Sequence, residues 1–274
     1  MALKYRMLVS DFDGTLGRSE GGISEGNIRA IQQYTENGGV FALCTGRMIS
    51  SILPYARELG LKGPVTAYQG AFICEAEDGK VLRDIRIDCA EAIEICEFLQ
   101  SNDYHIHVYD GNDFYVNKKD FFLDSYERIC KVTGIVTPFQ ISERVRKDGI
   151  RPQKILVMCS PEEKIKVFEQ LQERYGKRYD VTTSSDFLVE ITANGCDKGS
   201  AVRFLADYYG IPLKQIIAVG DNCNDVPMLK TAGLGVAVEN AVKEAKEAAH
   251  FVTKHCDADG VAYVIKKFGL GENI

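Results

Sequence analysis

Short continuous runs of apolar residues recur near both ends of the chain, where they alternate with longer segments of helical periodicity. Continuous apolar runs are typical of strands buried on both faces of a parallel sheet. We predict such strands at 7–9, 40–44, 65–68, 216–219 and 234–238. We predict helices, with apolar residues three or four positions apart, at 24–37, 49–59, 198–209, 226–232, 242–249 and 260–268. This alternation predicts an α/β fold with a doubly wound parallel sheet.

The middle of the chain shows a different pattern, in which apolar runs are paired across turn sequences. Asp78-Gly79 and Asp110-Gly111 each lie between two such runs, which favours two β-hairpins. Further strands are predicted at 154–159, 180–183 and 187–191, and helices at 90–100, 121–132 and 161–175. We therefore predict an α+β cap domain at 81–191, inserted between the core-domain segments 1–80 and 192–274.

Composition and charge exclude several classes of function. The chain has 274 residues, and its 45% hydrophobic content is enough for a buried core. A net charge of −6 argues against general binding to nucleic acid or to anionic membranes. We find no membrane-spanning run and no signal peptide, so we expect a cytoplasmic protein. The nine cysteines show no C-x-x-C spacing, which indicates reduced thiols and disfavours zinc. No obligate protein partner is evident.

The first candidate for chemistry is the acidic stretch Asp11-Phe12-Asp13-Gly14-Thr15, where the first strand is predicted to end. Carboxylates at i and i+2 point the same way if the backbone stays extended. One explanation is simply a solvated acidic turn. A calcium loop is excluded, because its required glycine and glutamate positions are Leu16 and Gly22 here. The remaining interpretation is a carboxylate nucleophile beside a carboxylic acid/base, which suits phosphoryl transfer through an aspartyl-phosphate.

Three further polar features follow predicted strands or begin a helix, at the edge where open parallel sheets bind ligands. Thr45-Gly46 offers a hydroxyl and an N–H to a phosphate oxygen, and Lys198 offers a positive charge. Asp221 is followed closely by Asn224 and Asp225. Each feature alone has an ordinary explanation as a turn, a surface lysine or a capped helix start. Together their order, strand context and charges indicate one site.

A magnesium ion would fit this set of residues. Mg²⁺ takes about six oxygen ligands and usually keeps several waters. Asp11, the backbone carbonyl of Asp13, and Asp221 would hold it together with a substrate phosphate. Such an ion shields the phosphate from the carboxylates and stabilises an in-line transition state.

These residues resemble the motifs of the haloacid dehalogenase (HAD) superfamily, specifically its Cof-like members with a large C2-type cap. The first motif is matched by Asp11-Phe12-Asp13-Gly14-Thr15 and the second by Thr45-Gly46-Arg47. The third is matched by Asp197-Lys198-Gly199 and the fourth by Gly220-Asp221-Asn222-Cys223-Asn224-Asp225. The stretches 233–241 and 259–262 also resemble the Cof-like pattern. The resemblance covers nearly the whole chain.

The resemblance implies a Rossmann-like HAD core and a role for each matched residue. Asp11 would be the nucleophile and Asp13 the general acid/base. The implied phosphate-binding residues are Phe12, Thr45, Gly46, Lys198 and Asn224, the metal ligands Asp11, Asp13 and Asp221, and the supporting residues Arg47, Asn222 and Asp225. One departure is Gln69, where these proteins usually have Asn. The longer side chain would shift any contact made at that position.

Two stretches of the predicted insert have open interpretations. His105, His107 and Tyr109 are predicted to share one face of a strand, which would look either toward the active site or toward solvent. The basic stretch with Arg144, Arg146, Lys147 and Arg151 is interpreted as a solvated loop.

The sequence thus predicts a Mg²⁺-dependent phosphatase for small phosphorylated metabolites, of the sugar phosphate, flavin mononucleotide or pyridoxal phosphate class. One alternative is a sugar-phosphate mutase or phosphotransferase of the same fold, in which an alcohol replaces water. Another is a phosphometabolite-sensing regulatory protein with weak catalysis. The pattern does not choose among the substrates, and it leaves the oligomeric state open.

Overall fold

The centre of the fold is a five-stranded parallel sheet, seen in a computed structural model that describes residues 3–274. Its strands, in spatial order, are β14 (Phe251–Val252), β13 (Leu234–Ala237), β12 (Ile216–Gly220), β1 (Met7–Ser10) and β2 (Val40–Leu43). Strand β1 lies in the middle, with Met7 opposite Ile216 of β12 on one side and Val40 of β2 on the other. The predicted doubly wound parallel sheet is confirmed.

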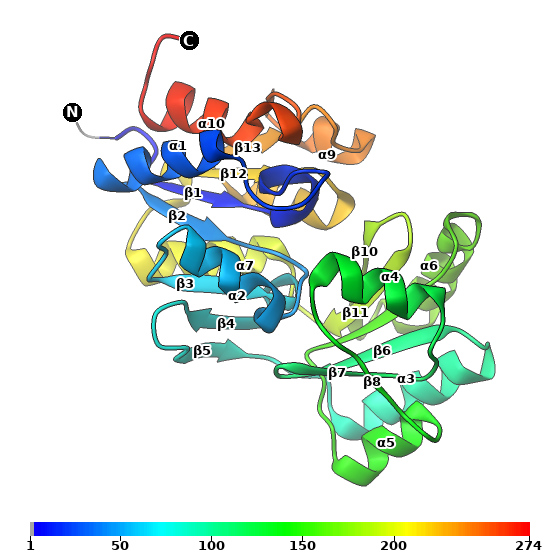
Figure 1. Cartoon of the computed structure of the whole chain (residues 1–274). Coiled ribbons are helices and arrows are strands. Elements are labelled where there is room, and N and C mark those ends of the chain that lie inside the picture. The colour runs from blue at the N-terminus through cyan, green and yellow to red at the C-terminus, as the bar shows by residue number, and fades with distance from the viewer. Residues whose placement is uncertain (1–2) are drawn as a thin grey trace.

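Helices cover both faces of this sheet. They are α1 (Glu25–Glu36), α2 (Ile49–Glu58), α7 (Lys198–Tyr209), α8 (Val226–Thr231), α9 (Lys243–Ala248) and α10 (Gly260–Val264). Figure 1 shows α1 and α10 on one face and α7 on the other. Helix α1 begins as predicted, because the Ser24 side chain accepts a hydrogen bond from the Asn27 N–H. Residues Met7, Leu8 and Val9 are fully buried between these layers.

The segment between β2 and α7 builds two further sheets. Strand β3 (Pro64–Ala67) joins β2 through a parallel bridge between Cys44 and Thr66, and pairs with the hairpin β4 (Phe72–Glu75) and β5 (Val81–Asp84). A six-stranded, mostly antiparallel sheet contains β10 (Tyr179–Ser185), β11 (Leu188–Ala193), β9 (Lys154–Met158), β6 (His105–Asp110), β7 (Asp113–Val116) and β8 (Ile135–Val136). This unit is the predicted α+β cap. The exact limits at 80 and 191 stay a prediction.

Two helix layers sandwich the six-stranded sheet. Its outer face packs against α3 (Cys89–Ser101), α5 (Ile141–Asp148) and α6 (Pro161–Tyr175). Its inner face packs against α4 (Phe121–Cys130), which lies on the side of the cap that faces the core (Figure 1). Alternate residues of β6 therefore serve different layers, with Ile106 and Val108 directed to the outer layer and Tyr109 to the inner one.

Two expectations for the cap are wrong. Arg144, Arg146 and Lys147 of the basic stretch lie on α5 rather than in a loop, because Ile141 and Val145 are buried one helical turn apart and hold α5 against α3; only Arg151 lies in a loop. The histidine face of β6 looks neither to solvent nor into the active site. His105 and His107 are at most 3% exposed and lie beneath α4, where His107 meets the Tyr126 ring edge-on.

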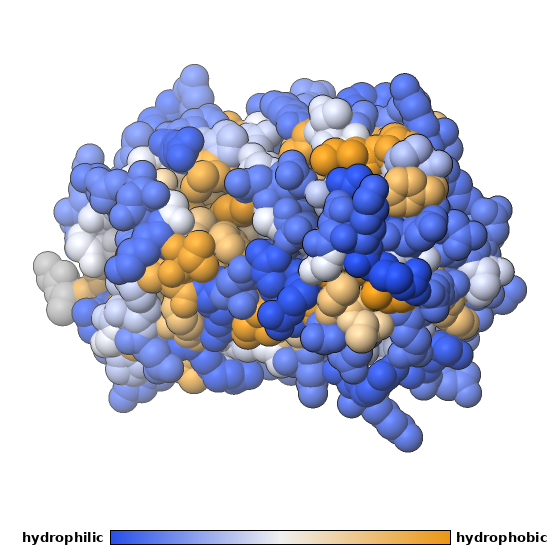
Figure 2. Space-filling view, turned by 90° about the horizontal axis from the view of Figure 1, so that it is seen from below, coloured by the Kyte–Doolittle hydropathy of each residue, from blue (hydrophilic) through white to orange (hydrophobic). Residues whose placement is uncertain are grey.

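Two structural findings bear on the expectations drawn from composition. All nine cysteines are free thiols. Among residues 3–274, no helix combines the length and apolar character that a bilayer crossing requires. Figure 2 shows one face of the molecule, where hydrophilic side chains cover most of the surface and hydrophobic ones gather in separate patches.

Candidate active site

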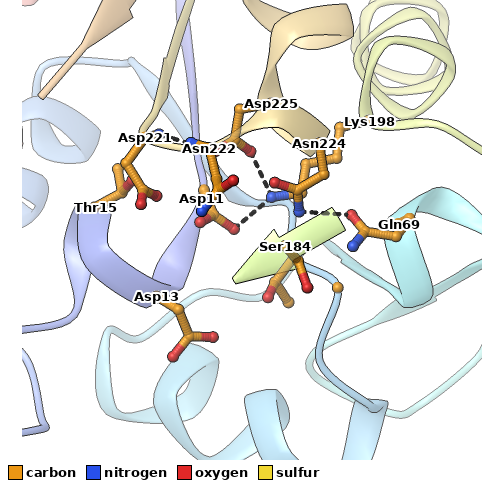
Figure 3. Close-up of polar contacts among 12 residues, drawn as sticks. Asp11, Asp13, Thr15, Gln69, Ser184, Lys198, Asp221, Asn222, Asn224 and Asp225 are labelled. Carbon is orange, nitrogen blue, oxygen red and sulfur yellow. Dashed lines mark hydrogen bonds and ion pairs between the residues drawn. The ribbon is translucent and has the colours of Figure 1, made fainter. Parts of the chain in front are cut away.

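The first, third and fourth predicted motifs lie together at the carboxyl ends of the central strands (Figure 3), and the second lines the same cavity as Asp11. Asp11 follows β1, Thr45 lies just beyond β2, Asp221 follows β12, and Lys198 is the first residue of α7. Neighbouring parallel strands end at the same edge of a sheet, so their following loops converge there. Residues far apart in the sequence thus form one polar cluster.

A buried ion triad forms the centre of this cluster. The Lys198 ammonium is fully buried and donates to Asp11 Oδ1 at 2.6 Å and to Asp225 Oδ1 at 2.5 Å. Burial alone would lower the pKa of Lys198, but attraction to Asp11 and Asp225 outweighs it and raises that pKa above its ordinary value. The lysine is therefore held charged beside the Asp11 carboxylate.

Asp225 is occupied by protein donors on both oxygens. Its Oδ2 accepts the backbone N–H groups of Asp221 and Asn222, each at 2.9 Å, while Oδ1 faces Lys198. Asn222 in turn accepts the Cys223 N–H and caps the same short turn. A Cβ at Gly220 would lie 2.5 Å from that of Asp225, so only glycine permits this approach. Asp225 and Asn222 therefore shape the loop and leave metal binding to other groups.

Asp11 and Asp221 are the carboxylates best placed to hold a cation. Carboxylate oxygens of Asp11, Asp221 and Asp225 all lie within 4.8 Å of one another. These three negative groups face a single ammonium, which leaves an excess of buried negative charge. Burial raises the pKa of Asp11, and burial with repulsion from Asp225 raises the pKa of Asp221 to about 7. A divalent cation fits this donor set, because it would restore the charge balance with hard oxygen ligands.

The loop after β1 is shaped around Asp221. Thr15 Oγ1 donates to Asp221 Oδ1 at 2.8 Å. Gly14 has φ +70°, and a Cβ there would lie 2.7 Å from Asp221 Oδ2. Glycine is therefore required at position 14 for two reasons. Its backbone has a positive φ, and a side chain would collide with Asp221.

Asp13 lies apart from the cluster and is held by an arginine. Arg47 donates from Nε to Asp13 Oδ2 at 2.8 Å and from Nη2 to Oδ1 at 2.6 Å. The Asp13 side chain is 53% exposed and points away from Asp221 (Figure 3). Its carboxylate does not join the metal cluster, so only its backbone carbonyl is free for the ligand role that the sequence suggested. Arg47 is itself fixed by Ser51 and by the carbonyl of Ile129 on α4.

The remaining predicted phosphate-binding residues surround Asp11. Thr45 is 1% exposed and its hydroxyl accepts the Arg47 N–H. The Phe12 ring packs 4.5 Å from Tyr55, which leaves the backbone of Phe12, rather than its side chain, to meet a phosphate. Asn224 donates to Gln69 Oε1, and its own Oδ1 is buried without a partner among residues 3–274. That orphaned acceptor faces the site and is available to a bound donor.

Gln69 links the core to the cap. Its Nε2 donates to Glu190 Oε1 on β11 at 3.1 Å, while its Oε1 accepts from Asn224. A Cβ at Gly46 would lie 2.3 Å from Gln69 Nε2, so the amide packs directly on the loop after β2. The extra methylene of Gln relative to Asn thus lengthens a side chain that reaches between the two domains.

Sequence reasoning missed the cap residues that close the site. Lys154 on β9 and Glu190 on β11 form an ion pair of 3.0 Å, and both side chains are at most 3% exposed. Lys154 Nζ also donates to the Gly46 carbonyl at 2.7 Å, and Ser184 donates to Glu190. The sequence did carry a signal for this pair, because Lys154 and Glu190 each lie at the end of, or inside, an apolar strand. A charged residue buried there requires a partner of opposite charge.

A cavity of about 420 Å³ separates the core from the cap. Asp11, Asp13 and Arg47 line its core side, and residues of α4, Lys154 and Glu190 line its cap side. This volume lies within the ~300–1,000 Å³ typical of small-molecule sites. The arrangement offers one carboxylate paired with a buried lysine, a second carboxyl group that lines the same cavity, and an oxygen-rich cluster that fits a metal.

Comparisons with known proteins agree with this geometry. Residues 8–265 match the family model of the haloacid dehalogenase-like hydrolases. A Haemophilus influenzae protein of provisional phosphatase assignment is 33% identical over 97% of this chain and 98% of its own length. A 5-amino-6-(5-phospho-D-ribitylamino)uracil phosphatase of Bacillus subtilis, YitU, is 27% identical over 98% of this chain and 99% of its own. The solved structure of TM0651 from Thermotoga maritima is 33% identical, with a TM-score of 0.80, over 96% of this chain and 97% of that one.

Proposed function

The chain belongs to the haloacid dehalogenase-like hydrolases, and from that premise we propose that it is a magnesium-dependent phosphatase of small phosphorylated metabolites. It is an enzyme of the phosphatase type, like the relatives named above. One of them is named for its substrate, a phosphoribitylamino-uracil, which supports a substrate of metabolite size. The observation that carries the proposal is the Asp11 carboxylate, which is paired with Lys198 and opens into a cavity beside Asp13.

The reaction proceeds in two displacements. An Asp11 oxygen attacks phosphorus, and the bond from phosphorus to the leaving oxygen breaks as Asp13 donates a proton to that oxygen. Asp13, now ionised, takes a proton from water as that water attacks the aspartyl-phosphate and releases inorganic phosphate. The first step thus leaves Asp11 phosphorylated and Asp13 ionised, and the second restores a free Asp11 and a protonated Asp13 for the next cycle.

The surrounding residues position these two groups. Lys198 holds Asp11 and balances charge on the phosphoryl oxygens, and Arg47 fixes the direction of the Asp13 carboxyl group. Thr45 and Asn224 line the same cavity as Asp11, so the Thr45 hydroxyl and the second hydrogen of the Asn224 amide would donate to phosphoryl oxygens. Asp11, the Asp13 carbonyl and Asp221 would hold Mg²⁺, whose charge would stabilise the in-line transition state.

Phosphate release by three variants tests this proposal. The parent protein should release inorganic phosphate from small phosphomonoesters in Mg²⁺ and lose that activity in EDTA. Asp11→Asn should abolish turnover while the thermal midpoint stays close to that of the parent. Asp13→Asn should instead accumulate a phosphorylated protein from p-nitrophenyl phosphate, whose leaving group needs little protonation.

Asp110→Asn is the matched control, because this carboxylate pairs with Arg86 away from the cluster. It should retain full activity. Mg²⁺-dependent hydrolysis by Asp11→Asn would refute the nucleophile assigned here. Absence of any turnover in the parent protein would favour a sensing role over catalysis.

A further inference from the structure

The cap side of the cavity carries an apolar lining, half of it aromatic, which we call the apolar wall. It consists of Phe121, Phe122, Ile129, Met158, Phe187 and Leu188. Three of these side chains are well exposed to solvent at the cavity mouth: Phe121 at 73%, Ile129 at 59% and Phe187 at 44%. Phe121 and Ile129 stand on α4, and Phe187 stands on the turn between β10 and β11.

The exposed members of the wall do not serve the hydrophobic core. Helix α4 already buries Leu123, Tyr126 and Cys130 against the inner face of the cap sheet. Phe121 and Ile129 lie eight residues apart, so both fall on another stripe of the same helix. Large apolar side chains that gather in the open beside a cavity mark a surface that a ligand covers.

The polar side chains of the cavity are largely paired with one another. Lys154 is bound to Glu190 and to the Gly46 carbonyl, and Ser184 donates to Glu190. Arg47 is bound to Asp13. Within residues 3–274, Ser125 and Arg128 are the polar side chains of the α4 lining that make no side-chain hydrogen bond or ion pair.

A sugar or polyol needs many free partners, because each hydroxyl taken from water without a hydrogen bond costs binding energy. This lining offers few. A flat ring, by contrast, gains from contact with Phe and Ile side chains and leaves little polar surface unpaired.

We propose that the preferred substrates are phosphomonoesters that carry a heteroaromatic ring, with the ring held against Phe121 and Ile129 of α4 and faced by Phe187. This inference rests on the proposed phosphatase function, and it selects one class among the metabolites that the family resemblance left open. With its phosphate at Asp11, the substrate spans the cavity from the core floor to the cap mouth. The few free polar groups there, Ser125 and Arg128, meet the ring's nitrogen and oxygen atoms.

Matched substrate pairs separate the ring from the phosphoester. Flavin mononucleotide and D-ribitol 5-phosphate share the same phosphorylated chain and differ by the ring system. Nicotinamide mononucleotide and ribose 5-phosphate form a second pair. We expect kcat/KM with Mg²⁺ to be at least tenfold higher for a ring-bearing member than for its ringless partner.

Alanine variants of the apolar wall then test whether these side chains cause the preference for ring-bearing esters. Phe121→Ala and Ile129→Ala should raise KM for the ring-bearing ester at least fivefold and leave kcat/KM for the ringless partner within twofold of the parent. Ile165→Ala on α6 is the matched control, because Ile165 is 67% exposed but does not line the cavity. It should change neither substrate. All three side chains are exposed, so the variants should fold, and equal thermal midpoints will verify this.

The outcomes distinguish the two proposals. Equal efficiency within both pairs, or equal loss for both substrates in Phe121→Ala, would overturn the ring preference while the phosphatase function stands. Failure to hydrolyse any of the four esters, together with acetyl phosphate as a ringless and reactive probe, would overturn both.

Discussion

The buried ion pair between Lys154 and Glu190 can be tested by removing its charges one at a time and then together. Lys154→Met keeps a similar side-chain length but leaves Glu190, which is 1% exposed, without its cation. Glu190→Gln keeps the shape and the acceptor oxygen but leaves the Lys154 ammonium, 3% exposed, without its anion. The double variant removes both charges and restores electrical balance.

The distance and burial set the magnitude. At 3.0 Å, and with an effective dielectric constant of about 20, Coulomb's law gives an attraction of about 5 kcal/mol. Most of that attraction only offsets the cost of taking both ions out of water. Each single variant should therefore lose about 3–5 kcal/mol, whereas the double variant should lose about 1 kcal/mol, mainly the hydrogen bond to the Gly46 carbonyl. The coupling between the two sites is then several kcal/mol.

Thermal unfolding of the four proteins at pH 7.5 measures this coupling. For a chain of this size, about 3 °C of midpoint corresponds to 1 kcal/mol, so each single variant should unfold about 10 °C below the parent. The double variant should unfold within about 4 °C of the parent. If its loss equals the sum of the two single losses, the pair is not coupled and the reasoning is wrong.

Two further predictions concern how thermal stability depends on pH and on Mg²⁺. Burial lowers the pKa of His105 and His107, so the unfolded chain binds more protons than the folded one below about pH 6.5. Stability from these histidines is complete above that pH and is lost as the pH falls, and His107→Phe should flatten the drop in thermal midpoint between pH 7.5 and 5.5. If the midpoint of His107→Phe falls as much as that of the parent, His107 is not a source of the pH-dependent stability. Mg²⁺ should raise the midpoint of the parent, and Gly14→Ala, whose Cβ would press on Asp221, should abolish that increase; an equal increase in both proteins would contradict the metal position.

Much of the core was predictable because its strands are short, continuous and apolar. β1, β2 and β12 are almost entirely buried, and Ser10 at the end of β1 is their only polar residue, so their apolar pattern is clear in the sequence. β14 has only two residues, and helix α5 has two buried apolar side chains, Ile141 and Val145. Patterns that short carry no periodicity, so both elements depend on tertiary packing.

The candidate site likewise contains one part that the sequence predicts and another that it does not. The cluster at Asp11, Lys198 and Asp221 was predictable because the topology of a parallel sheet brings strand ends together. The pair Lys154–Glu190 was not, because it depends on the register in which β9 meets β11. The histidines of β6 were misjudged for a similar reason. Their alternation marks a shared face, but only the position of α4 decides what covers that face.

The place of β1 in the central sheet also determines when the enzyme becomes active during its synthesis. The ribosome delivers Asp11 before the cap, whereas β12, the neighbour of β1, and both Lys198 and Asp221 are translated after the entire cap. The cap has its own hydrophobic cluster and can fold while the rest of the chain is still being made. A nascent polypeptide that ends within the cap therefore carries the proposed nucleophile without Lys198 and Asp221. We expect activity to begin only when the segment that follows the cap completes the central sheet.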